Sequence, residues 1–164
     1  MSAFNRDALI SALIAQIATT GIIVGDHIAP KEGGWSSGQP GMGEFTGYTA
    51  VFSGQVNLVP STFCPGDLDA SCQFSTRTFG TTRKQADDLA LLVRNCLVGF
   101  KPDAGEYRTN MLICNSIGPN ERMDDTEPKR WRVSDNYTAS MVPTRSIAKG
   151  GLSRRPADLA SATL

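Results

Sequence analysis

One segment near the C-terminal end of the chain, Trp131 to Met141, carries the most informative pattern in the sequence. Every second residue from Trp131 is apolar or aromatic except Asp135, and the residues between them are polar. Because successive side chains of a strand point to opposite faces of a sheet, this alternation predicts a strand with one dry and one wet face. The dry face makes Trp131 and Tyr137 candidate core anchors. The wet face is a candidate interface or channel lining, and it carries Arg132, Ser134, Asn136 and Thr138.

The length and charge balance of the chain limit its domain number and its possible binding partners. A chain of 164 residues is most simply one domain with its own hydrophobic core. Sixteen basic side chains balance sixteen acidic ones, so no long-range field draws the molecule to nucleic acid or to an anionic membrane. The apolar stretch at residues 8–17 is too short to span a bilayer and suits an amphipathic helix. We therefore expect a protein made in the cytosol that binds no membrane.

Two helices are predicted by their caps and their apolar spacing. Asn5 is a good N-cap for the first helix, and Gly21 ends it. Thr81 or Thr82 caps the second helix, and Gly99 ends it. The second helix carries apolar residues at the spacing of one helical face, among them the candidate core anchors Leu89 and Val93.

Further strands are expected at 48–53, 73–79 and 111–117. The first of them continues past Gly54 to residue 59 as a bulge or a turn. Glycine, proline and acidic residues over 118–127 predict a polar connection between the strand at 111–117 and the strand at Trp131, so that the two form a long hairpin-like pair. These elements predict an α/β (α+β) fold, in which the helices accompany a sheet.

Two segments are predicted to lack regular structure. Residues 29–46 contain so many glycines that we expect a loop that contacts a partner or is poorly ordered alone. Residues 144–164 form a basic tail without apolar periodicity, which we expect to be mobile in the free subunit. The predicted domain therefore covers residues 1–143, and the tail supplies further candidate interface residues, Arg145, Lys149, Arg154 and Arg155.

No segment of the sequence predicts a catalytic, cofactor or metal site. Gly34 to Gly38 matches the G-x-S-x-G pattern of serine hydrolases, with Ser36 as the nucleophile. That motif requires a strand before the serine, a helix after it and a histidine later in the chain, but His27 precedes it and is the only histidine. The acidic residues between 121 and 127 lack the spacing of a calcium loop. We predict that the protein is not an enzyme and needs no cofactor.

The four cysteines are too few and too irregularly spaced for a disulfide scaffold or for zinc knuckles. Cys96 and Cys114 fall in predicted elements, where a free cysteine behaves as a small hydrophobe. Cys64 and Cys72 flank a short loop and could approach each other, although a reducing cytosol disfavours a bond between them.

Several short strings, taken in order, resemble the tail-terminator proteins of long-tailed bacteriophages, particularly those of actinobacterial hosts. The similarity runs from about Arg6 to Pro143, and its weight lies in the order and spacing of the strings. They are the helix end at Gly21 with Gly25-Asp26 after it, the strand start Gly47-Tyr48-Thr49-Ala50-Val51, the junction from Phe79 to Ala86, the helix end Leu97-Val98-Gly99, and the segment from Arg130 to Tyr137. The glycine-rich loop and the basic tail lie outside the resemblance.

The resemblance implies both a fold and a role. It implies a curved mixed sheet with two helices on one face, assembled as a homohexameric ring. Such a ring would cap the tail tube, stop its polymerisation and join the tail to the head. Its partners would be the major tail tube protein and the head–tail connector of the neck, while DNA only passes through the channel. The protein would then lie at the tail–neck junction of the virion, after assembly in the cytoplasm of the host bacterium.

Two other functions stay open at this point. A head-completion or adaptor protein of the neck would share the same setting but would be mostly helical. A small hydrolase would need His27 and Ser36 to meet.

Overall fold

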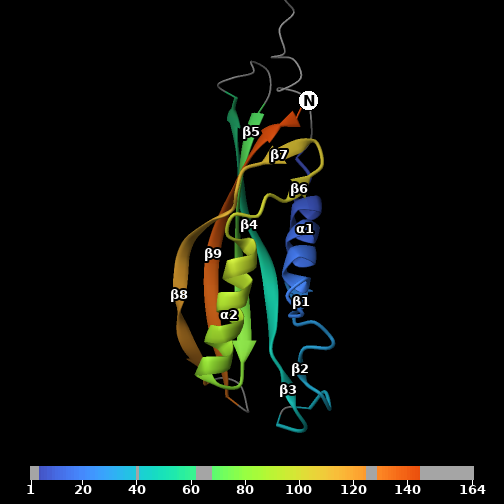
Figure 1. Cartoon of the computed structure of the whole chain (residues 1–164), viewed down its shortest axis with the longest axis vertical. Helices are drawn as coiled ribbons and strands as arrows, with labels where there is room; N and C mark the ends of the chain where they lie inside the picture. Colours follow the sequence, from blue (N-terminus) through green and yellow to red (C-terminus); the bar gives the residue numbers. More distant parts are fainter. Residues whose placement is uncertain (1–3, 40, 62–67, 125–128, 145–164) are drawn as a thin grey trace, which may run out of the picture.

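The computed structural model describes residues 4–39, 41–61, 68–124 and 129–144, and shows two helices packed on one face of a curled sheet (Figure 1). The elements in chain order are α1 (Arg6–Ala18), β1 (Ile23–Asp26), β2 (Gly34–Trp35), β3 (Phe45–Thr46), β4 (Tyr48–Pro60), β5 (Leu68–Gly80), α2 (Arg83–Leu97), β6 (Asp103–Ala104), β7 (Tyr107–Thr109), β8 (Ile113–Met123) and β9 (Arg130–Pro143).

The main sheet is mixed, and its strand order is β1-β4-β5-β9-β7-β6, with β8 also paired to β9. The pair β1–β4 is parallel, whereas the other pairs of this sheet are antiparallel. The long strands β4, β5 and β9 run side by side through the molecule, and β8 and β7 share the far side of β9 (Figure 1). The predicted fold class, a mixed curved sheet with two helices on one face, is confirmed, as is the hairpin-like pair near the C-terminus.

Both helix caps form as the sequence predicts. The side chain of Asn5 accepts a hydrogen bond from the backbone N–H of Ala8 at 3.1 Å. Of the two candidate caps for α2, Thr82 is the N-cap, and its hydroxyl accepts from the N–H of Gln85 at 3.1 Å. Gly21 follows the end of α1 with a φ of 81°. A glycine allows this left-handed conformation without steric cost and so ends the helix there.

The dry face of β9 forms the centre of the core. Tyr137 stacks on Phe74 of β5 with ring centroids 5.1 Å apart. Both rings pack against α1 and α2, which bury their apolar faces on the same side of the sheet. The helical part of this core consists of Leu9, Ile10, Leu13, Ile17, Val93 and Leu97. None of the described helices has the length and apolar character needed to cross a membrane.

The expected polar connection after residue 117 was wrong, because β8 continues as far as Met123. β9 is long enough to pair with it there, and the register continues from Asn120 opposite Val133 to Met123 opposite Arg130. Two register shifts absorb the Gly118-Pro119 segment. Gly118 is required at this place, since an added Cβ would lie 2.2 Å from the carbonyl oxygen of Ser134.

The glycine-rich loop also differs from the prediction, because part of it is regular. β2 and β3 pair as a small antiparallel hairpin in which Trp35 lies opposite Phe45. Their rings meet edge to face at 5.3 Å. Glycines at 38, 41 and 43 have φ between 72° and 81° and make the tight return of the chain possible. An aromatic contact at the base of the loop thus outweighs the tendency of glycine to oppose strands.

Candidate functional site

The polar side chains of β9 lie on the sheet face that the helices leave uncovered. Arg132, Ser134, Asn136 and Thr138 alternate with buried residues along the strand. Paired residues on neighbouring strands point to the same face, so Gln73, Ser75 and Arg77 of β5 join them. We call these seven residues the polar face. Its β5 members were missed, although the alternation of polar residues with Phe74, Thr76 and Thr78 was a signal for them.

Side chains of β8 hold the polar face in place by hydrogen bonds across the strands. Asn136 donates to the hydroxyl of Ser116 at 2.9 Å. Asn115 donates to the hydroxyl of Thr138. Each of these groups is uncharged and keeps capacity for further hydrogen bonds, so this part of the face is able to bind water or a polar partner.

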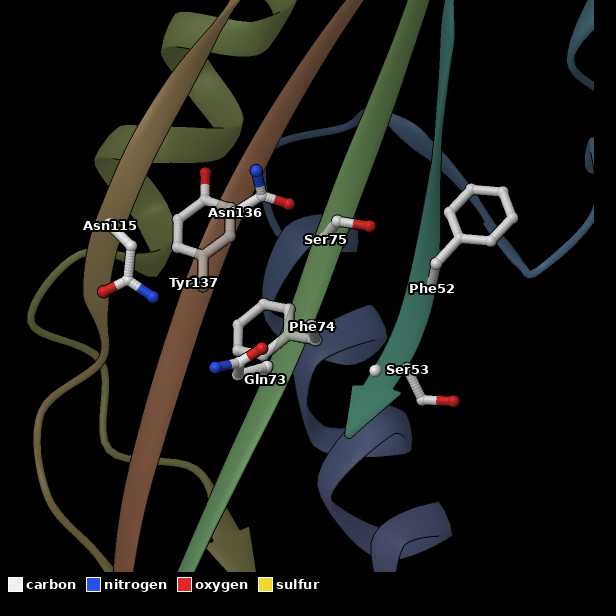
Figure 2. Close-up of a pocket in the computed structure, with 9 residues that line it drawn as sticks. Phe52, Ser53, Gln73, Phe74, Ser75, Asn115, Asn136 and Tyr137 are labelled. Carbon is white, nitrogen blue, oxygen red and sulfur yellow. The ribbon is translucent and has the colours of Figure 1, made fainter. Parts of the chain in front are cut away.

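An open cavity of about 210 Å³ lies between β4 and β8 on this face (Figure 2). Figure 2 shows its labelled residues on β4, β5, β9 and β8, among them the amide side chains of Gln73, Asn115 and Asn136. The cavity holds no charged side chain. Its lining residues are Phe52, Ser53, Gly54, Gln73, Phe74, Ser75, Asn115, Asn136 and Tyr137.

The arginines of the polar face are held by neighbours. Arg132 forms an ion pair with Glu121 of β8. The guanidinium of Arg77 lies 4.4 Å from the ring centroid of Phe52, a cation–π contact. Most of the remaining face is hydroxyl and amide. The site therefore has the chemistry of a wet, nearly neutral surface.

Asp135 breaks the apolar alternation of β9 because it forms a buried ion pair. It is 1% exposed, and Arg94 of α2 donates to its Oδ2 at 2.8 Å. Next to it, burial raises the pKa of Tyr137 above its ordinary value, and the carboxylate of Asp135 raises it further. Asp135, a polar residue on the otherwise apolar dry face of β9, thus links α2 to the sheet.

The four candidate core anchors differ in burial. Tyr137 and Val93 are 0% exposed, whereas Leu89 and Trp131 are partly buried. Trp131 packs in a small separate cluster with Ala86, Ala90 and Val133. The candidate interface residues Arg145, Lys149, Arg154 and Arg155 lie outside the described residues.

The G-x-S-x-G segment does not form a nucleophile elbow. The hydroxyl of Ser36 accepts a hydrogen bond from the N–H of Glu44 at 3.1 Å, inside the β2–β3 hairpin. His27 bonds instead to Ser53, at 2.9 Å between Nε2 and Oγ. The hydrolase alternative that joins His27 to Ser36 is therefore wrong. The sequence carries no signal for Ser53, since it lies 26 residues from His27 and only the pairing of β1 with β4 brings them together.

Over the described ranges, no three histidine, cysteine or acidic side chains are placed to hold a metal ion. Cys72 is a buried free thiol, and Cys96 and Cys114 are free and partly buried. Burial raises the pKa of all three thiols, which keeps them protonated. Cys64 lies outside the described residues.

Comparisons with known proteins show a similarity in fold. No protein-family profile matches the sequence, and no curated protein matches it either. Among solved structures, the chain is similar to a chain of the "Virion of native gene transfer agent (GTA) particle", with a TM-score of 0.57 and 18% identity. The similarity covers 82% of this chain and 95% of that chain. The two chains thus share a fold over most of this chain and nearly all of that chain.

Proposed function

We propose that this chain is a structural virion protein of the tail-terminator kind, which closes the end of a tail tube as a ring. Two findings support the proposal. The chain shares its fold with a component of a phage-like particle over 82% of its length. Its sequence strings resemble tail terminators in their order and spacing.

The polar face is the observation on which the proposal mainly depends. An antiparallel sheet commonly keeps one face on the core and the other in water. Here the wet face extends along β9, and hydroxyl and amide groups dominate it. If these faces lined the channel of a ring, DNA would slide past neutral hydrogen-bonding groups. A channel lined by many unpaired basic groups would instead hold the phosphates of the DNA.

Unpaired strand edges favour an assembly over a monomer. Within the described residues, β8 pairs with β9 alone, and β1 covers only the Tyr48–Val51 end of β4. Exposed apolar side chains lie on both strands: Ile113 and Ile117 on β8 are each 61% exposed, and Val59 on β4 is 54% exposed. Neighbouring subunits in a closed ring would cover such edges through heterologous contacts. The proposed partners are further copies of the chain, the tail tube protein and the head–tail connector.

The neck-adaptor alternative receives less support. That class would be mostly helical, whereas the described chain has two helices and a sheet of seven strands.

Purified components test the proposed function directly. Native mass spectrometry of the protein, alone and with short tail tubes, measures ring formation, and electron microscopy measures tube length as subunits are added. We expect rings on tube ends and an arrest of tube growth. Tubes that keep growing in excess protein, with no ring on their ends, would overturn the proposal.

A further inference from the structure

Three side chains form a hydrogen-bonded chain at the outer edge of β4, and one of them, Ser53, also lines the cavity on the polar face. Asp26 Oδ1 contacts His27 Nδ1, and His27 Nε2 lies 2.9 Å from Ser53 Oγ. An acid, an imidazole and a hydroxyl in this order are the groups that activate a serine for attack on an acyl carbon.

The backbone explains how His27 reaches β4. β1 ends at Asp26, and the N–H of His27 makes one further bond, to the carbonyl of Val51 at 2.9 Å. His27 then adopts a φ of 59°, and no other described non-glycine residue has a positive φ. This conformation costs energy and is concentrated at functional sites in proteins. It turns the chain away from the sheet while the imidazole stays beside β4.

A second hydrogen bond fixes the protonation pattern of the imidazole. The backbone N–H of Ser53 donates to His27 Nε2 at 3.1 Å. Nε2 must therefore carry the lone pair, and Nδ1 carries the proton that is shared with Asp26. In this form the imidazole accepts a proton from the Ser53 hydroxyl, and the same Nε2 lone pair is shared with the Ser53 N–H.

The three groups are open to a small reactant. The side chains of His27 and Asp26 are 46% and 60% exposed. Ser53 stands where the register of β4 shifts and where β1 no longer pairs with it. The ring of Phe52 lies edge to face against the imidazole, with centroids 5.6 Å apart. The guanidinium of Arg77 also lies against the ring of Phe52.

We propose that Ser53 is a nucleophile activated by His27 and Asp26, and that it accepts the acyl group of small activated aryl esters. Oγ bonds to the ester carbon while its proton passes to His27 Nε2. The bond from that carbon to the aryl oxygen then breaks, and the aryl oxide leaves with the proton. Water gives a proton to His27 Nε2 and attacks the carbonyl carbon of the acyl-serine. The bond from that carbon to Ser53 Oγ then breaks, Oγ takes the proton back from His27, and the carboxylic acid is released. This activity is independent of the proposed assembly role.

A fluorophosphonate probe tests the proposal, because it leaves a stable mark. Ser53 Oγ displaces fluoride at phosphorus, and the proton leaves through His27 as hydrogen fluoride. Peptide mass spectrometry of the full chain should place the mark on Ser53. Ser36→Ala is the matched control, because Ser36 lies in the G-x-S-x-G segment. This variant should label like the unmodified chain.

Three variants separate activation from a purely structural contact. Ser53→Ala should abolish labelling. His27→Asn tolerates the left-handed backbone but supplies no base, and it should slow labelling by about 100-fold or more. Asp26→Asn should also slow it, because the amide no longer holds the imidazole in the required tautomer. Thermal unfolding of each variant checks that the fold is kept.

The dependence of labelling on His27 in a folded protein is the readout that a purely structural contact would not change. The proposal is overturned if Ser53 labels no faster than Ser36 does, or if His27→Asn labels at the unmodified rate in a folded protein. In either case the three residues only end the pairing of β1 with β4.

Discussion

The guanidinium of Arg94 on α2 donates two hydrogen bonds to one carboxylate oxygen of Asp135 on β9, with nitrogen–oxygen distances of 3.2 and 2.8 Å. The carboxylate is buried, and the arginine side chain is 20% exposed. This ion pair places α2 over the strand whose other face is the polar face. The orientation of the helix and the position of the wet strand therefore depend on each other.

Asp135→Ala should destabilise the fold by about 3 kcal/mol, because it leaves a largely desolvated guanidinium without its partner. Urea unfolding measures this change. The exposed pair of Arg132 and Glu121 provides the control, and Glu121→Ala should cost less than about 1 kcal/mol. An equal effect of the two substitutions would show that Arg94 and Asp135 contribute no more than a surface pair.

Trp131→Ala should cost about 3 kcal/mol, the lower end of the range for removing a large aromatic side chain. Trp131 is only partly buried, and its cluster consists of two alanines and Val133. Thermal unfolding at several protein concentrations checks the prediction. A shift no larger than that of a surface substitution would reassign Trp131 to an interface.

The fold should weaken at alkaline pH through Tyr137. Burial raises the pKa of its phenol above the ordinary value of 10.0, so the folded state resists an ionisation that the unfolded state accepts. The stability from this group is complete below about pH 10 and is lost as the pH rises further. Urea unfolding from about pH 8 to pH 11 should therefore show falling stability. Tyr137→Phe should flatten this fall in part, because burial also raises the pKa of Tyr48. An unchanged slope in Tyr137→Phe would contradict the prediction.

The long periodic elements were predictable, and the reasons are local. α2 has two caps and an apolar stripe, and β9 alternates over its length, so each pattern fits a single element. The continuation of β8 was missed because Gly118-Pro119 has the composition of a turn. Only the length of β9 gives that segment a partner to pair with.

The candidate sites were predictable only in part, for a different physical reason. The wet residues of β9 are visible in the sequence because their alternation is local. The chain of Asp26, His27 and Ser53 was not visible, because it depends on a parallel strand pair and on one positive φ. Contacts between residues far apart in the chain produce no periodic pattern in the sequence.

Adding a positive charge to the polar face should affect DNA passage and leave folding unchanged. Asn136 is exposed in the middle of that face, so Asn136→Lys would place one cation per subunit there. In a ring that encloses DNA, these cations would grip phosphates in a salt-dependent way. Asn95→Lys, an exposed change on α2, is the matched control. We expect slower, salt-sensitive DNA release only in Asn136→Lys particles, and equal release in the two variants would place the polar face outside the channel.

Deleting residues 145–164 should leave the domain folded but weaken ring formation or head joining. The described core lies entirely before residue 144, and the N–H of Thr144 still bonds the carbonyl of Glu106 at 2.7 Å after this cut. We propose that the deleted basic segment contacts a neighbouring subunit or a neck protein. Circular dichroism and native mass spectrometry measure the two effects. A truncated chain that assembles and supports infectious particles like the full chain would remove any docking role from the tail.

Electron microscopy of particles made with and without this protein tests the central claim most directly. A ring that stops the tail tube and joins it to the head has two separable consequences. Without the protein, we predict tails of uncontrolled length that are not joined to heads, and normal particles when the chain is supplied again. Tails of normal length beside unjoined heads would contradict the tail-terminator function and favour a neck adaptor.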